Sequence, residues 1–179
     1  MIKDIVDQYG IKQIGYYVQS IEETAAQLRE ALGAGPFIDL GISEPASCEF
    51  RGEQIAIRSR CALGQLGGMQ LELIESHTEG MDPYQEMGRF GIHHFCIWAD
   101  DVDAVVEQCK AEGIEPAMTM VSGQGLKVVY LDAREQLGQY IEVNAPIEQL
   151  AGAVAAVHAK WEGDESVIGM DVLMKMMGR

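Results

Sequence analysis

Basic residues are scarce in this chain. Lysine and arginine together number 13, against 28 aspartate and glutamate residues, which gives a formal net charge of −15 over 179 residues. A chain with this charge is repelled by nucleic acids and by anionic membrane surfaces, so we expect neither as a partner. The same deficit disfavours a substrate held by many phosphates or carboxylates. We therefore expect a small-molecule substrate that is less anionic than a coenzyme A ester.

Paired cysteines and long apolar segments are also absent. The four cysteines, Cys48, Cys61, Cys96 and Cys109, lie far apart in the sequence, without a Cys-x-x-Cys pair. This spacing is typical of free thiols in a reducing compartment rather than of a disulfide framework. No segment reaches the roughly 18 apolar residues of a membrane span, and residues 1–7 lack the apolar core of a signal peptide. We therefore expect a cytoplasmic protein.

What the chain does contain is an internal repeat. The segment 11–18 and the start of the helix predicted after it have a second version over residues 92–103, and the segment 68–72 is repeated as 138–142. A repeat of this kind sets the architecture before any single motif does. The length suits one domain or two small modules that share a core.

Each copy of the repeat is predicted to form a β-α-β-β-β unit. In the first copy, the β-branched and aromatic residues of 11–18 indicate a strand. Ser20 and Glu23 then have the spacing of a capping box, and apolar residues follow at helical period until Gly33. Further strands are predicted over residues 35–42, 54–63 and 69–75, with a polar loop over residues 43–53.

The second copy repeats this order, and two helices follow it. Its elements are a strand over residues 92–99, a helix over 101–112, and strands over 114–121, 125–131 and 138–144. The linking segment 77–91 is predicted to hold one helical turn, and the segments 151–161 and 166–177 to be helices. The predicted divisions are a first module over 1–80, a second module over 81–146 and a helical extension over 147–179.

The repeat also aligns four side chains that can bind a metal. Gln13 aligns with His94, and Glu72 aligns with Glu142. A carboxylate inside a strand is costly unless it is paired, solvated or bound to a metal. Two carboxylates, an amide and an imidazole suit Zn²⁺, Ni²⁺, Co²⁺, Mn²⁺ or Fe²⁺, and argue against a thiolate zinc site. By strand alternation, His93 is predicted to face away from His94.

These segments resemble the vicinal-oxygen-chelate superfamily, which includes glyoxalase I, methylmalonyl-CoA epimerase, extradiol dioxygenases and drug-resistance proteins. The resemblance covers roughly residues 11–145. It is carried by the segments Ile11–Val18, Leu32–Phe37, Leu71–Glu75, Asp82–Tyr84, Gly91–His94 and Gly138–Glu142. It implies an α+β fold in which two tandem βαβββ modules form a cupped mixed sheet around a central cavity, followed by C-terminal helices.

The resemblance also implies one divalent metal ion, with a ligand from the first and last strand of each module. Carried over by position, these ligands are Gln13, Glu72, His94 and Glu142. Many members have a histidine where this chain has Gln13, whereas eukaryotic-type glyoxalase I has the Gln/Glu/His/Glu set. Zn²⁺, Ni²⁺ and Co²⁺ are the favoured ions, with Mn²⁺ and Fe²⁺ as further candidates.

The function implied is that of a metal-dependent lyase or isomerase of the glyoxalase I type. The metal would bind vicinal oxygens of the substrate, and a carboxylate would shuttle a proton next to the carbonyl through an enediolate. Glu142 would be the main base and Glu72 its counterpart. An epimerase of an acyl thioester and a non-catalytic small-molecule binding or resistance protein remain alternatives. An extradiol dioxygenase is disfavoured because it needs two histidine ligands and only His94 occupies a ligand position.

Two further groups of residues bear on the substrate and on assembly. Cys96 and Trp98 share the predicted face of His94 and are expected to line the cavity. The basic side chains that could hold a carboxylate or a thiol adduct are Arg51, Arg58, Arg60, Lys127 and Arg134. The methionine-rich segment 166–177 predicts an apolar subunit contact, and therefore a homodimer.

Overall fold

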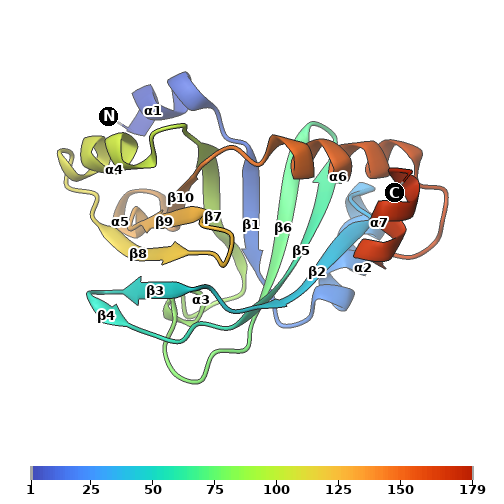
Figure 1. The fold of residues 1–179 in the computed structure, drawn as a ribbon, viewed down its shortest axis with the longest axis horizontal. Helices are drawn as coiled ribbons and strands as arrows, with labels where there is room; N and C mark the ends of the chain where they lie inside the picture. The colour runs from blue at the N-terminus through green and yellow to red at the C-terminus, as the bar shows by residue number, and fades with distance from the viewer. Residues whose placement is uncertain (1, 179) are drawn as a thin grey trace.

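The computed structural model describes residues 2–178, so Met1 and Arg179, the outermost residues of the predicted first module and extension, lie outside the described residues. The strands are β1 (Gln13–Tyr17), β2 (Phe37–Ser43), β3 (Ser47–Phe50), β4 (Glu53–Gln54), β5 (Ser59–Leu66), β6 (Met69–Ser76), β7 (Gly91–Trp98), β8 (Pro116–Val121), β9 (Lys127–Leu131), β10 (Tyr140–Asn144) and β11 (Val167–Gly169). The helices are α1 (Ile2–Tyr9), α2 (Ile21–Leu32), α3 (Pro83–Glu86), α4 (Val102–Lys110), α5 (Arg134–Leu137), α6 (Glu148–Lys160) and α7 (Met170–Met176). The predicted α+β class is confirmed (Figure 1).

The strands form one mixed sheet whose two halves mirror the sequence repeat. Its order is β11-β2-β5-β6-β1-β7-β10-β9-β8-β3-β4. Strand β1 runs parallel to β6, β7 runs parallel to β10, and the antiparallel pair β1–β7 joins the two halves at the centre (Figure 1). The first and last strands of both modules therefore lie side by side. Because one sheet runs through both halves, the module boundaries at residues 80 and 146 stay a prediction.

The helix predicted in each module is present, and it is stabilised by capping residues and by a buried apolar face. The Ser20 hydroxyl accepts a hydrogen bond from the backbone N–H of Glu23 at the start of α2, and Gly33 ends this helix in a left-handed conformation. Asp101 caps α4 in the same way. Ile21 of α2 and Val105 of α4 are fully buried in two separate apolar clusters, one in each module. Each helix thus covers its own half of the sheet.

The predicted polar loop over residues 43–53 was wrong, because this region contains β3 and the start of the β3–β4 hairpin. Strand β3 lies in the first module by sequence but pairs with β8 of the second. Cys48 and Phe50 alternate inward and are buried, whereas Ser47 and Glu49 are exposed. A four-residue strand with so many polar residues carries little signal in the sequence, and its long-range partner stabilises it. The strand predicted from residue 54 consequently begins only at Ser59.

Three more short elements were not predicted, and one predicted helix begins late. They are α1, α5 and β11, and the last occupies the start of the segment 166–177 that was predicted to be wholly helical. Residues Val167–Gly169 extend the sheet beside β2 before α7 begins at Met170. Within residues 2–178, no helix is both long enough and apolar enough to cross a membrane.

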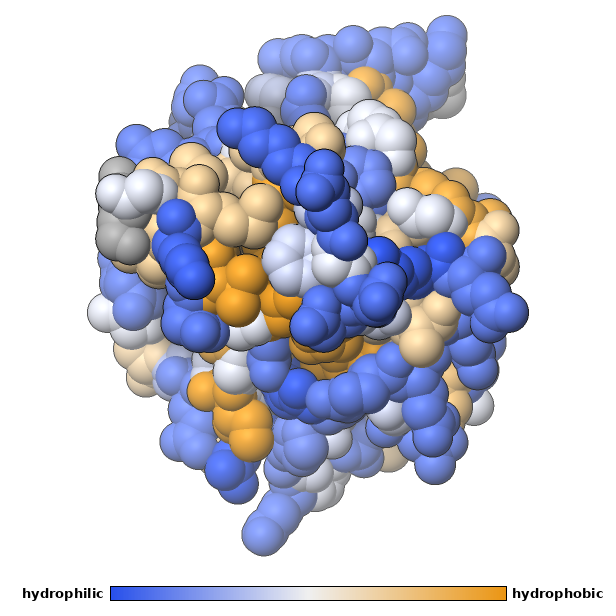
Figure 2. Space-filling view, turned by 90° about the vertical axis from the view of Figure 1, so that its right-hand side faces the viewer, coloured by the Kyte–Doolittle hydropathy of each residue, from blue (hydrophilic) through white to orange (hydrophobic). Residues whose placement is uncertain are grey.

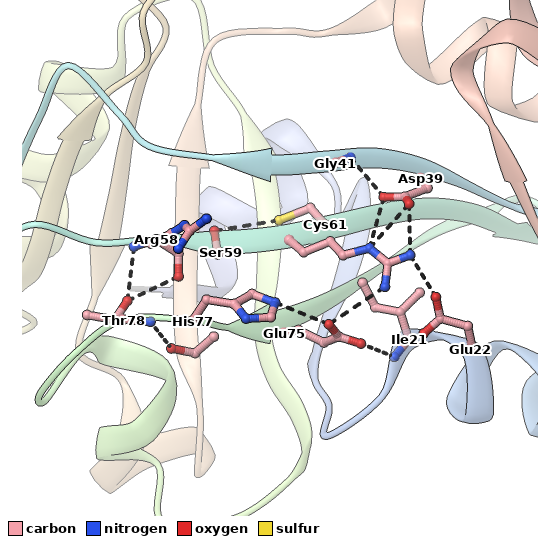
Figure 3. Close-up of polar contacts among 12 residues, drawn as sticks. Ile21, Glu22, Asp39, Gly41, Arg58, Ser59, Cys61, Glu75, His77 and Thr78 are labelled. Carbon is pink, nitrogen blue, oxygen red and sulfur yellow. Dashed lines mark hydrogen bonds and ion pairs between the residues drawn. The ribbon is translucent and has the colours of Figure 1, made fainter.

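The outward face of β5 is held by ion pairs. The Arg60 guanidinium donates to Asp39 of β2 and to Glu22 of α2, at 2.8 and 2.7 Å, and lies 3.8 Å from Glu75 of β6. Figure 3 shows these three carboxylates converging from different elements. Because side chains alternate along a strand, the neighbouring residue Cys61 points to the opposite face of β5, toward the cavity described below.

Candidate metal centre

Glu72, His94 and Glu142 come together at the centre of the sheet. One donor atom from each lies within 4.8 Å of the other two. The His94 Nε2 atom is 3.5 Å from a Glu72 carboxylate oxygen and 3.3 Å from a Glu142 carboxylate oxygen. The three residues come from β7 of the central β1–β7 pair and from β6 and β10, the strands on either side of that pair. This is the clustering that the repeat predicted for three of the four candidate ligands.

Gly15 makes room for this cluster. It lies opposite His94 in the β1–β7 register and opposite Glu72 in the β1–β6 register. A Cβ atom at this position would be 2.0 Å from His94 Cε1 and 2.3 Å from Nε2, which no side chain tolerates. The imidazole therefore lies directly over the Gly15 backbone, and the glycine is required because a residue with a side chain would displace the ring.

Replacing Gly15 with alanine is expected to disturb the centre without changing any candidate ligand. The displaced imidazole should lower metal affinity by about 10–100-fold, the range seen when the support of a ligand is lost, and overpacking should lower the free energy of unfolding by about 1–3 kcal/mol. Isothermal titration with Zn²⁺ and urea unfolding measure the two effects. Gly68→Ala is the matched control, because its added Cβ meets nothing within 4 Å. Equal zinc affinity in both variants would contradict this account of Gly15.

His93 determines which ring nitrogen of His94 carries the hydrogen. The His93 Nε2 atom is 3.1 Å from the carbonyl oxygen of Pro83, which can only accept, so Nε2 carries the hydrogen. Burial lowers the pKa of His93 to about 4, so its ring is neutral near pH 7 and its Nδ1 is an acceptor. This Nδ1 is 3.1 Å from Nδ1 of His94, which must therefore donate. The lone pair of His94 is then on Nε2, which faces the two carboxylates.

The prediction that His93 faces away from His94 was wrong. Strand β7 has a β-bulge opposite the Gly15–Tyr16 step: Gly15 pairs with His94 and Tyr16 pairs with Ile92, which leaves His93 without a partner. A bulge interrupts the alternation of side chains. Both imidazoles are fully buried, and their rings meet edge to face at 5.4 Å. The alternation rule fails here because it assumes a regular ladder.

The surroundings of His94 Nε2 suit a cation. This atom is buried and has no hydrogen-bond partner among the described residues. A nitrogen lone pair that faces two carboxylate oxygens is unfavourable unless positive charge lies between them. A divalent ion satisfies all three groups at once, and one nitrogen with two oxygens is a set that Zn²⁺, Ni²⁺ and Co²⁺ accept. These residues therefore fit the metal that the sequence led us to expect.

Gln13, the fourth predicted ligand, lies in the wall of the cavity onto which the carboxylates open. Its amide Nε2 donates to Oε1 of Gln70 on β6 at 2.8 Å, and only 3% of the residue is exposed. This contact uses the nitrogen of the Gln13 amide and leaves its carbonyl oxygen as the atom that can bind a ligand. Gln13 as a metal ligand stays a prediction.

The cavity has a volume of about 540 Å³ and is lined by both halves of the sheet and by the start of α6. Sequence reasoning missed Cys61, Tyr84 and Tyr130 in its wall. The alternation of Ser59, Cys61 and Leu63, all in the wall, could have indicated the inward face of β5. Tyr84 comes from the helical turn α3 and Tyr130 from strand β9 of the second module, so only the fold brings them together.

Cys96 and Trp98 were expected to line the cavity, but neither belongs to its wall as the described residues form it. The Cys96 thiol is buried behind the wall and donates to the Asn144 side chain at 2.9 Å. The indole nitrogen of Trp98 is also buried.

Burial is the largest cause of the pKa shifts of the three residues in the centre. Burial raises the pKa of Glu72, and the nearby Glu142 carboxylate raises it further. Burial likewise raises the pKa of Glu142, against hydrogen bonds from Cys96 and Tyr130 that lower it. The pKa of His94 is well below its ordinary value because of burial and because of His93. A bound cation would oppose the shifts of both carboxyls, since it favours their ionised form.

The metal-free protein is therefore expected to lose stability as the pH rises, most clearly above about 7.5, where both histidines are almost fully neutral in the folded and unfolded states. In this range, native Glu72 and Glu142 still bind protons that the unfolded chain has released. The free energy of unfolding then falls by about 1.4 kcal/mol for each unit of pH over which one carboxyl stays protonated. Urea unfolding in EDTA between about pH 6.5 and 8.5 measures this slope. Glu72→Gln should flatten the slope, and an unchanged slope would contradict the assignment.

The geometry matches a known family. A family model described as the Glyoxalase/Bleomycin resistance protein/Dioxygenase superfamily matches residues 12–130. The chain belongs to this superfamily. Its proteins include glyoxalases, epimerases and dioxygenases, and they typically bind a divalent metal. The clustered Glu72, His94 and Glu142 can bind such an ion.

Solved structures of this superfamily have a similar fold. A hypothetical protein from Bacillus halodurans is 22% identical, with a TM-score of 0.55, over 78% of this chain and 95% of its own. Methylmalonyl-CoA epimerase from Mycobacterium tuberculosis is 16% identical, with a TM-score of 0.53, over 80% of this chain and 93% of its own. A methylmalonyl-CoA epimerase in complex with methylmalonyl-CoA and NH4+ is 20% identical, with a TM-score of 0.50, over 77% and 94%. No curated protein matches the chain. At these identities the likeness shows the fold alone.

Proposed function

We propose that this protein is a metal-dependent lyase or isomerase of the glyoxalase I type, which moves a proton next to a substrate carbonyl. One observation carries the proposal: the buried lone pair of His94 Nε2 faces two carboxylates that open onto a cavity. Such an arrangement combines a site for a Lewis acid with carboxylates that can accept a proton.

The residues that would hold the ion are Glu72, His94 and Glu142, with Gln13 as the fourth. When bound, a divalent ion such as Zn²⁺, Ni²⁺ or Co²⁺ supplies Lewis-acid polarisation of a carbonyl oxygen. His93 keeps the His94 lone pair directed at the ion through the bond between the two Nδ1 atoms. Gly15 keeps the imidazole close to the backbone.

Glu142 is the proposed base and Glu72 its counterpart. Both carboxylates line the cavity, so a substrate in it meets them from two sides. A base works best when its pKa is near the working pH, and burial moves the pKa of Glu142 upward toward that range. The nearby Cys96 thiol and Tyr130 hydroxyl act against burial and lower the pKa of Glu142. A pair of opposed carboxyls can remove a proton on one face of a carbon atom and return it on the other.

Solvent deuterium exchange tests the proposal. The protein is incubated in D2O with a glutathione hemithioacetal, an α-hydroxy ketone or a 2-oxo thioester, with and without added Zn²⁺, Ni²⁺ or Co²⁺, and exchange is followed by NMR. Metal-dependent exchange or conversion of the hemithioacetal or the ketone supports the proposal. Metal-dependent exchange into the thioester alone would favour an acyl-thioester epimerase, the activity in the names of two structural relatives. No exchange, with tight metal-free binding of an aromatic compound, would favour a binding protein.

The homodimer is also a proposal, and the methionines of the last helix support it. Met170, Met174 and Met177 are 39–48% exposed although methionine is usually buried. On the face that carries α7, apolar areas alternate with hydrophilic ones (Figure 2). Light scattering at micromolar concentration should give twice the chain mass, and Met174→Lys should lower it. A monomeric mass for the unmodified chain would contradict the dimer.

A further inference from the structure

The cavity at the metal centre lacks a counter-charge for an anion. Its ionisable carboxylates are Glu72, Glu142 and, at the exposed edge, Glu44. Among the described residues that line it, none is lysine, arginine or histidine. A buried carboxylate or phosphate needs a paired cation or several hydrogen bonds to offset its lost hydration. The wall of this cavity supplies no such cation.

The five basic residues that the sequence offered for an anionic substrate do not line this cavity, and all are paired with acids; the partner of Arg58, Glu44, lies at the edge of the cavity. Arg60 is held by Asp39 and Glu22 on the outer face of β5, where Figure 3 shows both acids. The other pairs are Arg58 with Glu44, Arg51 with Glu86 and Asp132, Arg134 with the same two acids, and Lys127 with Asp103. Using one of them for a substrate anion requires breaking an existing pair.

The charge balance of the centre points the same way. A divalent ion bound to two carboxylates has no net charge left, and the neutral His94 adds none. An additional anion would then find no positive charge left at the ion, and Glu44 at the edge of the cavity is already paired with Arg58. Compensation would come from neutral hydroxyl and amide groups of the wall and from bulk water at the mouth, and the effect of the water weakens as the group enters the cavity.

Much of the rest of the wall is apolar, and the cavity is of suitable size for a small molecule. Leu40, Ile57, Met120, Leu126, Ile147 and Leu150 surround the carboxylates, and the last two belong to the start of α6 and the residue before it. A cavity of about 540 Å³ accepts a molecule of small-drug size, and an apolar wall binds an uncharged hydrocarbon body. Besides the three carboxylates, Gln13 and the tyrosines, the polar side chains of the wall are the neutral Ser43, Ser59, Ser122, Gln124 and Asn144.

We propose that the part of the substrate that enters the cavity is uncharged, with two vicinal oxygens, as in an α-hydroxy ketone or a 1,2-dicarbonyl, attached to an apolar body, and that no carboxylate or phosphate group enters with it. The substrate class rests on the proposed metal-dependent function, because the vicinal oxygens are assigned to the ion. The exclusion of charged groups from the cavity, called the charge rule below, rests on the cavity wall alone. The two parts can therefore fail separately.

A pair of chelating probes that differ by one carboxylate tests this substrate class. Benzohydroxamic acid and 3-carboxybenzohydroxamic acid are titrated calorimetrically into the zinc-loaded full chain. We expect the carboxylated probe to bind at least about tenfold more weakly, because its charge enters a cavity without a cation. Equal or tighter binding of the carboxylated probe would overturn the proposal, as would failure of benzohydroxamic acid to bind at all.

A new cation in the wall should reverse the preference. Met120 is half-buried at the cavity, and lysine has nearly the same length. Met120→Lys should tighten binding of the carboxylated probe about tenfold and leave benzohydroxamic acid unchanged, whereas the matched control Met120→Gln should do neither. If Met120→Lys does not fold, the comparison of the two probes on the unmodified chain still decides.

Metal-free protein separates this inference from the proposed function. If benzohydroxamic acid binds equally well with and without zinc while its carboxylated analogue is still rejected, the charge rule holds and the metal-dependent function fails. If binding requires zinc but both probes bind alike, the metal centre stands and the substrate class is overturned.

Discussion

Glu142→Gln is expected to lower turnover by more than the 10²–10⁴-fold that is typical of losing a general base, while the protein stays folded. Glutamine keeps the shape of the side chain and one carbonyl oxygen, so much of the metal binding should remain. It removes the carboxylate that can accept a proton. The loss exceeds that of a base alone because the same carboxylate is also a candidate metal ligand.

The measurement is the initial rate of whichever substrate exchanges in D2O, together with zinc stoichiometry of the same preparation. Glu53→Gln is the matched control, since Glu53 is an exposed carboxylate on β4, away from the centre. Glu72→Gln should also lower the rate, because it is the opposed carboxylate. Full activity in Glu142→Gln, with Glu72→Gln inactive, would exchange the two roles. Full activity in both variants would reject the proposed chemistry.

His94→Ala should remove the metal. The imidazole is the nitrogen donor of the cluster and is fully buried, and alanine leaves two carboxylates facing an empty volume. We expect zinc to fall from about one ion per chain to background after dialysis, because the remaining donors repel each other without the ion. The fold should persist, since the metal-free carboxyls can take up protons. Plasma emission analysis and circular dichroism on protein purified without a histidine tag measure both.

His93→Ala distinguishes a ligand from its support. Losing the Nδ1 acceptor frees the His94 ring to change tautomer, so zinc affinity should fall by about 10–100-fold but not vanish. His77→Ala is the control, because His77 is a partly exposed side chain that pairs only with Glu75 in the described contacts. If His94→Ala keeps its zinc and His93→Ala loses it, the two histidines have the opposite roles.

The candidate ligands of the metal centre could be predicted from the sequence because the internal repeat aligns equivalent positions of the two modules. Gln13 aligns with His94 and Glu72 with Glu142, and the paired modules bring the first and last strands of both halves together at the middle of the sheet. The helices were predictable for a local reason: Ser20 and Gly33 act on backbone groups within a few residues of themselves. Interactions of this range are encoded by neighbouring residues.

Other features of the protein could be learned only from the tertiary structure, because they depend on contacts between segments that are distant in the sequence. Strand β3 forms because β8 pairs with it, and His93 turns toward His94 because a bulge is forced where β7 pairs with Gly15. The absence of basic side chains from the cavity could not be read from a scarcity of lysine and arginine. It required seeing that residues such as Arg60 are bound by acids from other strands and helices. The sequence thus determined which donors exist and how they repeat, whereas packing determined which atoms face one another, since that depends on register, bulges and pairing across the whole sheet.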